Sequence, residues 1–286
     1  MILVTGATGH LGGAVIDFLL KKSHRVKVAA LVRDKNKAEE LSKKGVELRD
    51  GDYTNYSSLV EAFKGVEKLG FVSSSELENR VQQHTNVVNA AKEAGVKHIY
   101  YTSGVRASVN SKFIPSHDHA KTEEAIKASG LTYTIFRNTF YMDELPGFLA
   151  NPLKTGKWVF PTNGAKANYA SRIDMAEALA NAIYDGGHEN KVYEITSDKA
   201  YTDYEIAEIV SKVTGKELKY TDVPLSKFIE GLKKASLPEA TITMIKSVSG
   251  AIRDGELDIV DDSLEKLLGR KPQSMEDFLK KALVSS

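Results

Sequence analysis

Residues 1–12 read Met-Ile-Leu-Val-Thr-Gly-Ala-Thr-Gly-His-Leu-Gly, and this stretch decides the fold. Residues 2–5 form an apolar run long enough for a buried strand, and apolar residues at helical spacing follow over 15–20. Gly6, Gly9 and Gly12 lie between the two. A strand, a glycine turn and a helix in this order aim the unpaired N–H groups of the helix start at a phosphate. The sequence therefore predicts a dinucleotide site at this turn.

The spacing of the three glycines is G-x-x-G-x-x-G, which differs from the more common G-x-G-x-x-G pattern. The physical requirement is the same in both patterns. Gly6 permits a sharp turn, Gly9 lets the backbone approach a pyrophosphate, and Gly12 lets the helix pack close to the sheet. We assign cofactor binding to the whole turn, that is, to Gly6, Thr8, Gly9, His10, Leu11 and Gly12.

The kind of dinucleotide depends on the residue that follows the second predicted strand, 26–32. Sites for NAD usually carry an acidic residue there, which takes the ribose 2′-hydroxyl. This chain has Arg33, whose guanidinium can hold a 2′-phosphate through paired, charged hydrogen bonds. In the alternative interpretation the segment is an ordinary solvated helix start, with Asp34 as its N-cap. We predict NADP.

Composition restricts the function classes. The chain has 286 residues, of which 42% are apolar and 27% charged, as expected for a globular protein with a real core. Its net charge of +1 does not suggest nucleic acid or a membrane surface as a partner. The absence of cysteine excludes disulfides and thiolate chemistry. Since the glycine turn starts five residues after Met1 and no apolar stretch is long enough to span a membrane, we expect a cytoplasmic protein without membrane insertion. We expect neither a metal nor a flavin.

The first half of the chain alternates between strand and helix patterns, which predicts an α/β fold of the Rossmann type, a doubly wound parallel sheet. Strand-like runs follow at 46–48, 68–72, 97–102 and 131–137. Helical patterns separate them at 35–44, 57–64, 79–94 and 117–128.

After residue 137 the pattern changes to a loop-rich region with prolines and a predicted hairpin near 157–160. A helix at 174–185 and a strand at 192–196 are expected to return to the sheet. Helical patterns then follow at 203–214, 225–235, 239–251, 262–268 and 275–284. We therefore predict two domains. Residues 1–138 with about 169–199 form the NADP-binding domain, and about 139–168 with 200–286 form a smaller, mostly helical substrate-binding lobe.

The ends of the predicted strands carry polar residues at the edge that faces a cofactor in this fold. Asp52 can accept a hydrogen bond from an adenine amino group, and Tyr53 can lie against the ring, although a simple polar turn is the alternative. The serines that follow the next strand suit a ribose or phosphate, and Ser103 is expected near the nicotinamide. These serines are Ser73, Ser74 and Ser75.

The helix after the fifth strand lacks a tyrosine. Dehydrogenases of the short-chain type use Tyr-x-x-x-Lys there, because four-residue spacing places both side chains on one face and the lysine lowers the pKa of the tyrosine. Here His117 stands in the tyrosine position and Lys121 keeps the lysine position. The imidazole of His117 can supply a proton near pH 7, or it can be a polar residue at the helix start.

The segment after the sixth strand is expected to line the nicotinamide pocket. Asn138 can hydrogen-bond a ligand, and Phe140 and Tyr141 can form a flat aromatic wall for a planar substrate. Packing between lobes is the alternative for Phe140. We take His117 and Tyr141 as the candidate catalytic residues.

Taken in their order and spacing, short segments along the whole chain resemble the NmrA-like family of atypical short-chain dehydrogenases. Within that family they are similar to bacterial type-2 NAD(P)H:quinone oxidoreductases and triphenylmethane dye reductases. These segments are residues 4–12, 31–33, 51–53, 72–76, 95–99, 101–103, 133–138, 187–193 and 261–269. The resemblance implies NADPH-dependent reduction of a small quinone-like or dye-like acceptor, with Lys121 at the nicotinamide ribose.

A missing tyrosine is consistent with this activity, because a quinone takes hydride onto a conjugated system and its oxygens are easily protonated. The enzyme would then act mainly by holding acceptor and nicotinamide face to face. A non-catalytic sensor that binds NADP(H), as in the regulators of the NmrA branch, is the alternative. A sugar-nucleotide epimerase shares the fold but needs the Tyr-x-x-x-Lys pair that His117 interrupts.

Overall fold

The computed structural model describes residues 1–23 and 26–284. Contacts within the chain divide it into two compact units, each assembled from three separate segments. The first unit comprises Met1–Val109, Asp118–Asn138 and Arg172–Glu194. The second unit comprises Asn110–His117, Thr139–Ser171 and Ile195–Ser286.

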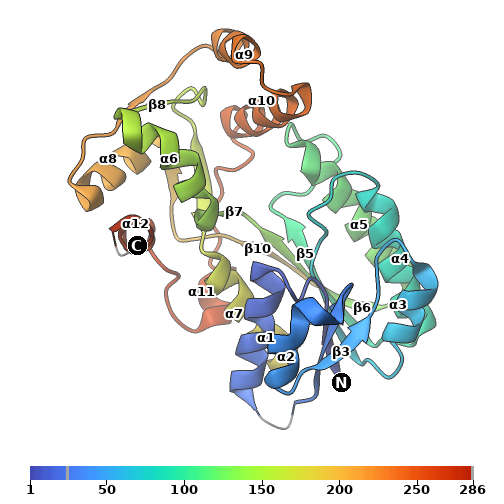
Figure 1. The fold of residues 1–286 in the computed structure, drawn as a ribbon. Coiled ribbons are helices and arrows are strands. Elements are labelled where there is room, and N and C mark those ends of the chain that lie inside the picture. Colours follow the sequence, from blue (N-terminus) through green and yellow to red (C-terminus); the bar gives the residue numbers. More distant parts are fainter. Residues whose placement is uncertain (24–25, 285–286) are drawn as a thin grey trace. The chain divides into compact units, whose positions relative to one another are not determined.

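The centre of the first unit is a seven-stranded sheet in the order β10-β6-β5-β4-β1-β2-β3 (Figure 1). The pairings from β3 through β6 are all parallel. The strand order reverses next to β1, which lies between β2 and β4, so this is the topological switch point of a doubly wound fold. The predicted Rossmann-type α/β class is therefore confirmed. The strands are β1 (Ile2–Val4), β2 (Val28–Val32), β3 (Glu47–Asp50), β4 (Lys68–Phe71), β5 (His98–Gly104), β6 (Thr132–Asn138) and β10 (Lys191–Ile195).

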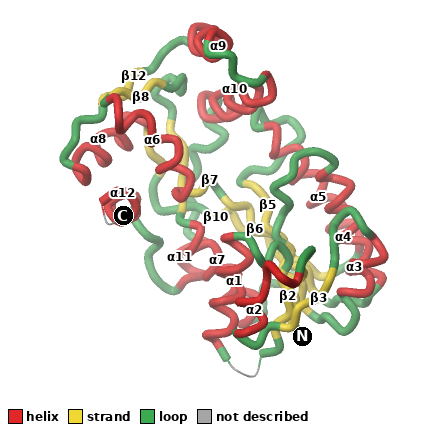
Figure 2. Tube along the Cα trace, in the orientation of Figure 1, coloured by secondary structure: helices red, strands yellow, loops and turns green. Residues whose placement is uncertain are grey.

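Helices cover the sheet and bury its apolar strands, as in other parallel sheets. All five residues of β2 are buried. Helices α1 and α7 lie side by side, and so do α3 and α4 (Figure 2). The side chains of Leu3, Leu69 and Ile99 are fully buried and belong to one apolar cluster. The helical elements are α1 (His10–Lys22), the short 3₁₀ helix η1 (Lys35–Ala38), α2 (Glu39–Lys43), α3 (Tyr56–Ala62), α4 (Arg80–Glu93), α5 (Ile114–Ser129) and α7 (Arg172–Asp185).

The second unit combines helices with two small sheets. In one, β9 (Lys166–Ala170) pairs with β7 (Phe140–Tyr141) and β11 (Ala200–Thr202). In the other, β8 (Lys157–Val159) pairs in parallel with β12 (Lys219–Thr221). Its helical elements are η2 (Met142–Glu144), α6 (Leu145–Thr155), α8 (Asp203–Thr214), α9 (Leu225–Lys234), α10 (Glu239–Arg253), α11 (Ser263–Leu268) and α12 (Met275–Val284).

Three expectations about individual elements were wrong. The hairpin near 157–160 does not form, because β8 finds its partner in β12, about sixty residues further along the chain. The region expected to be rich in loops because of its prolines contains helix α6. Pro146 lies in the first turn, where its missing N–H is not needed, and Pro152 is tolerated further inside. Helix α5 begins at Ile114, three residues before the predicted start, so His117 is the fourth residue of the helix and still lies in its first turn.

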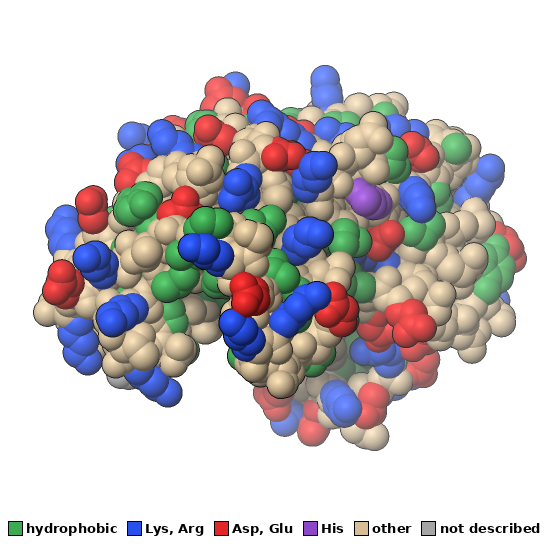
Figure 3. All heavy atoms as spheres, turned by 90° about the horizontal axis from the view of Figure 1, so that it is seen from above, with side chains coloured by type: hydrophobic (Ala, Val, Ile, Leu, Met, Phe, Trp, Pro, Cys, Tyr) green, Lys and Arg blue, Asp and Glu red, His purple; other side chains and the backbone are tan. Residues whose placement is uncertain are grey.

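The surface is mixed in charge. Basic and acidic side chains are interspersed over the face drawn in Figure 3, in keeping with the net charge of +1. Over residues 1–23 and 26–284, none of the helices has the length and apolar character needed to cross a bilayer.

Candidate functional site

The glycine turn between β1 and α1 has the geometry of a phosphate cradle. Gly6 adopts a left-handed backbone conformation with φ of +60°, which makes the sharp turn. Gly9 precedes the helix, and no side chain caps the helix start. A Cβ atom at Gly12 would lie 2.4 Å from the carbonyl oxygen of Gly6, so only glycine allows helix and turn to approach so closely. The predicted close packing at Gly12 is confirmed, and the open helix start at the switch point fits a dinucleotide phosphate.

Three polar groups hold this turn in place from behind. The backbone N–H of Val72, just after β4, donates to Oγ1 of Thr5 at 3.0 Å. The hydroxyl of Tyr53 reaches both Thr5 Oγ1 and the carbonyl oxygen of Val72, the latter at 2.8 Å. Burial raises the pKa of Tyr53, so the phenol stays protonated. The hydroxyl of Tyr53 therefore links the residue after β1 to the residue after β4, a role that the sequence did not reveal.

The side chain of Arg33 extends from the end of β2 and is 71% exposed. Its guanidinium pairs with Glu76 Oε1 at 3.1 Å. Asp34 accepts a hydrogen bond from the backbone N–H of Asn36 at 2.9 Å, so its role as an N-cap is confirmed. The carboxylate of Asp34 is thus engaged in local capping, while Arg33 keeps most of its surface open to a ligand.

Asp52 lies in the turn after β3. Its Oδ1 accepts hydrogen bonds from the backbone N–H and the hydroxyl of Thr54, at 2.7 and 2.6 Å. Burial alone raises the pKa of Asp52, but these hydrogen bonds and the charge of Arg33 outweigh burial and lower it. The group is therefore an ionised acceptor near neutral pH, as recognition of an amino group requires.

The serines after β4 are held by their backbones. The N–H of Ser73 donates to Thr102 Oγ1 at 2.9 Å, and the N–H of Ser74 donates to a histidine of α4 at 3.0 Å. The Ser74 hydroxyl accepts from the N–H of Glu76. Within the described chain the hydroxyls of Ser73 and Ser75 have no protein partner. Rigid backbone with free hydroxyls suits hydrogen bonding to a ligand.

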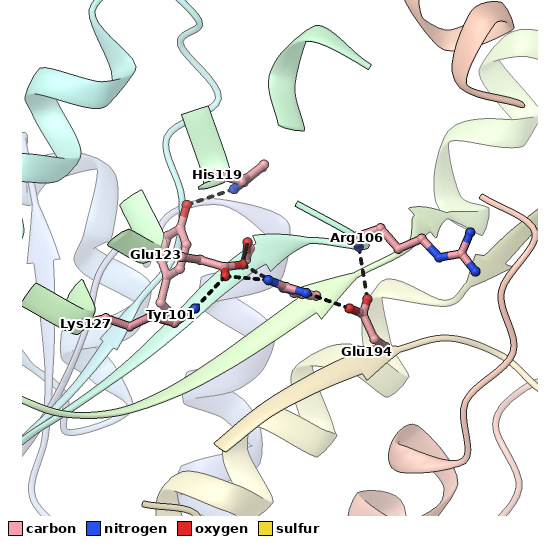
Figure 4. A network of polar contacts seen from close by, with 8 residues as sticks. Tyr101, Arg106, His119, Glu123, Lys127 and Glu194 are labelled. Atoms are coloured by element: carbon pink, nitrogen blue, oxygen red, sulfur yellow. Dashed lines mark hydrogen bonds and ion pairs between the residues drawn. The ribbon is translucent and has the colours of Figure 1, made fainter. Parts of the chain in front are cut away.

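A charged network fixes the end of β5 (Figure 4). Ser103 donates from Oγ to Glu123 Oε1 at 2.7 Å. The guanidinium of Arg137 on β6 donates hydrogen bonds to both carboxylate oxygens of Glu123, at 2.9 and 2.8 Å. It also donates to Glu194 of β10 at 3.0 Å. The backbone N–H of Arg106 donates to the other oxygen of Glu194 at 3.1 Å. The network thus joins α5, β5, β6 and β10.

The electrostatics of this network decide what Ser103 can do. Glu123 is only 2% exposed. Burial alone raises the pKa of its carboxyl, but the hydrogen bonds from Arg137 and Ser103 outweigh burial and lower it. Because the carboxylate stays ionised, Ser103 must donate its only hydroxyl proton to Glu123. The Ser103 oxygen is then left to accept a hydrogen bond from a ligand, an orientation that the sequence could not indicate.

The other predicted site residues are divided between the two units. In the first, Asn138 ends β6 as the register partner of Gly104, and Lys121 is exposed on α5 without a partner in the described chain. In the second, the Nε2 atom of His117 lies 2.7 Å from the carbonyl oxygen of Ser111. Tyr141 is the last residue of β7 in the same unit.

The strand order, with a glycine turn at its switch point, defines a Rossmann-fold protein. The chain belongs to the NmrA-like family, whose model matches residues 1–279. It is 38% identical to quinone oxidoreductase 2 of Escherichia coli over 94% of both chains.

Two solved structures extend the comparison. An NADPH-dependent quinone oxidoreductase of Escherichia coli, complexed with NADPH, superposes with a TM-score of 0.94 at 35% identity and covers 99% of both chains. The triphenylmethane reductase of a Citrobacter species, complexed with NADP(H), superposes with a TM-score of 0.92 at 38% identity, covering 99% of this chain and 100% of that one.

Proposed function

We propose that this protein is an NADPH-dependent oxidoreductase that transfers hydride to a quinone or a similar conjugated planar acceptor, such as a dye. The observation that carries the proposal is the full-length similarity to an NADPH-dependent quinone oxidoreductase and a triphenylmethane reductase, both solved with the cofactor. The glycine turn supports the proposal, because the uncapped start of helix α1 suits the cofactor phosphates and Gly12 lets that helix approach the turn closely.

The residues of the first unit would hold the cofactor along the carboxyl edge of the sheet. The turn from Gly6 to Gly12, with Thr8, Gly9, His10 and Leu11, would take the pyrophosphate, and Arg33 the 2′-phosphate. Asp52 would accept from the adenine amino group, beside Tyr53. When bound, NADPH supplies the hydride. The ribose and nicotinamide would meet the remaining polar groups, which are Ser73, Ser74, Ser75, Ser103, Lys121 and Asn138.

A conjugated acceptor suits a site without a strong acid. The Tyr-x-x-x-Lys pair is missing, and alignment of the acceptor with the nicotinamide can supply most of the rate enhancement. In this proposal residues 1–138 and about 169–199 bind NADPH. Residues of about 139–168 and 200–286 bind the acceptor, and His117 and Tyr141 contact it.

The direct test is anaerobic oxidation of NADPH by the purified protein with a simple soluble quinone, with NADH as the comparison. We expect rapid, saturable turnover that prefers NADPH. Tight NADPH binding, measured by nucleotide fluorescence, without turnover of any quinone or dye would overturn the proposal. That result would point instead to a sensor of NADP(H) state.

A further inference from the structure

A buried polar cluster in the first unit lies beside the end of β5 and is not used by the function proposed above. It consists of His84 on α4, Tyr101 on β5, and His119 and Thr122 on α5; we call it the histidine cluster. His84 is fully buried and His119 is 9% exposed. Two imidazoles and a phenol in such surroundings need defined donors and acceptors, because an unmatched buried polar group is costly.

The hydrogen bonds determine which nitrogen of His84 carries its proton. The backbone N–H of Ser74 donates to Nε2 at 3.0 Å, so Nε2 must be an acceptor. The proton is therefore on Nδ1, which donates to Thr122 Oγ1 at 2.9 Å. The Thr122 hydroxyl in turn donates to the carbonyl oxygen of Asp118 at 2.7 Å. His84 consequently offers Tyr101 no lone pair.

This arrangement also determines the tautomer of His119. The Tyr101 hydroxyl lies 2.8 Å from Nδ1 of His119, as Figure 4 shows, and 3.5 Å from the protonated Nδ1 of His84. Thr122 Oγ1, which also interacts with the phenol, already accepts from His84 Nδ1 and donates to Asp118, so we assign the phenol proton to the short contact with His119 Nδ1. The single proton of a neutral His119 is then on Nε2.

Both imidazoles remain neutral over the working range of pH. Burial, together with the nearby positive charge of Arg80, lowers the pKa of His119 to about 3. Burial, His119 and Arg80 lower the pKa of His84 to about 3 as well. Arg80 is itself buried and held by Asp118, with Nε 3.2 Å from Oδ2. The Nε2–H of His119 is thus a neutral donor that does not titrate.

The edge of the His119 ring that carries Cδ2 and Nε2 packs against Gly104 at the end of β5. A Cβ atom added to Gly104 would lie 3.1 Å from Cδ2 and 3.7 Å from Nε2 of His119, so the imidazole packs directly against this glycine. In the described chain the Nε2 atom of His119 has no hydrogen-bond partner. It is not fully buried, unlike the unpartnered Nη2 atom of Arg80. The Nε2 atom therefore lies next to Gly104, the residue that follows Ser103 and is in register with Asn138.

We propose that His119 is a catalytic residue that donates a hydrogen bond from Nε2 to the carbonyl oxygen of a quinone acceptor. The inference rests on the proposed function, which puts the reacting end of the cofactor at Ser103. Hydride addition converts a quinone into a hydroquinone monoanion, and the electron pair ends on that oxygen. A neutral imidazole N–H stabilises this charge without losing its proton. Water then supplies the proton that completes the hydroquinone.

Comparing the turnover of a quinone with that of a cationic dye distinguishes a catalytic role of His119 from a purely structural one. A cationic triphenylmethane dye takes hydride at its central carbon and becomes neutral, so no oxyanion forms. We compare His119→Gln, whose amide keeps an N–H near the position of Nε2, with His119→Met, which has the same length but no donor. In His119→Met we expect the ratio of quinone kcat to dye kcat to fall by about tenfold to a hundredfold, and in His119→Gln to recover most of it.

Readouts without turnover test the same assignment. In ¹⁵N-labelled protein, the histidine resonance that disappears in both variants should report a neutral ring protonated on Nε2. NADPH fluorescence titration should show unchanged affinity in both variants, which also verifies folding. Between pH 5 and 9 the quinone kcat of the wild type should show no change that is lost in both His119 variants, because burial and Arg80 keep His119 neutral against the opposing charge of Glu123, with His84, Tyr101 and Asp118 also beside it.

Gly104→Ala gives a second route if the His119 variants fold poorly. Its methyl group would push the imidazole by a few tenths of an ångström, and we expect a lower ratio of quinone to dye turnover. Equal losses for quinone and dye, or an Nδ1–H tautomer, would overturn the role of His119 and leave the proposed function intact. If the wild type reduces neither acceptor, the proposed function itself fails.

Discussion

At the scale of single residues, Arg33 is the position we expect to set cofactor preference. Its guanidinium is mostly exposed at the end of β2, and Asp34 is engaged in capping. Arg33→Ala removes charged hydrogen bonds to a 2′-phosphate, so the Kd for NADPH should rise by about tenfold to a hundredfold. Fluorescence titration should show little change for NADH. Lys37→Ala, which removes one positive charge four residues further along the chain, is the control. Equal weakening of NADPH and NADH binding in Arg33→Ala would refute the assignment.

In the proposed site Glu76 would compete with the 2′-phosphate for Arg33, because its carboxylate lies 3.1 Å from the guanidinium. Glu76→Gln removes this competing charge. An exposed ion pair is weak, so we expect the Kd for NADPH to fall by only about two- to fivefold, with NADH unchanged. Glu78→Gln, a neutralised acid on the same loop, serves as the matched control. Weaker NADPH binding in Glu76→Gln would show that Glu76 orients Arg33 and does not compete with the ligand.

At the scale of elements, the junction of β1 and α1 depends on one close approach. In Gly12→Ala the new methyl group would meet the Gly6 carbonyl oxygen at 2.4 Å, and backbone cannot yield as a flexible side chain does. We expect a loss of about 1–3 kcal/mol in the free energy of unfolding, together with loss of NADPH affinity. Gly147→Ala in α6 meets nothing within 4 Å and should be neutral or stabilising. Urea denaturation and fluorescence titration measure both effects, and an intact Gly12→Ala would contradict the packing argument.

The joint between α5 and β6 depends on the ion pair of Glu123 with Arg137. The folded protein lowers the pKa of Glu123. Its contribution to stability is therefore complete above the ordinary glutamate pKa of about 4.3 and is lost as pH falls through the folded value. Glu123→Gln should lose about 3 kcal/mol of unfolding free energy at pH 7, near the lower limit for a buried pair because Glu194 still holds Arg137.

Denaturation curves between pH 3 and 7 test this pair. The stability difference between wild type and Glu123→Gln should shrink toward the acid end of this range. Glu124→Gln, which neutralises the exposed neighbour on the same helix, should follow the wild type at every pH. A difference that stays constant with pH would mean that packing, and not charge, makes the contribution.

At the scale of the whole molecule, the first unit is assembled from three segments of the chain, so its stability involves residues from 1 to 194. A ligand that binds only the folded unit stabilises it by mass action. At a free NADPH concentration of 100 times Kd, the unfolding free energy should rise by about 2.7 kcal/mol. NADH at the same concentration should stabilise less, and equal stabilisation by both would contradict the NADP preference.

Local signals predicted individual elements well. Helix α8 occupies the expected residues 203–214, because Thr202 and Glu205 form a capping box at its start and Gly215 ends it in a left-handed conformation. The helix expected at 79–94 is observed as Arg80–Glu93. The pairing of β8 with β12 has no such local signal, since nothing within either segment identifies a partner so distant in the chain.

By itself, the sequence determined the order of strands and helices in the first unit, the Rossmann class and the glycine turn, because hydrophobic periodicity, caps and close-packing glycines act over a few residues. The tertiary structure alone decided which polar groups meet. Ser103, Glu123, Arg137 and Glu194 come from four elements, and the Nε2–H of His119 is fixed by hydrogen bonds that begin at Ser74. Proton positions and ion pairs depend on distances between side chains, and only the folded chain sets those distances.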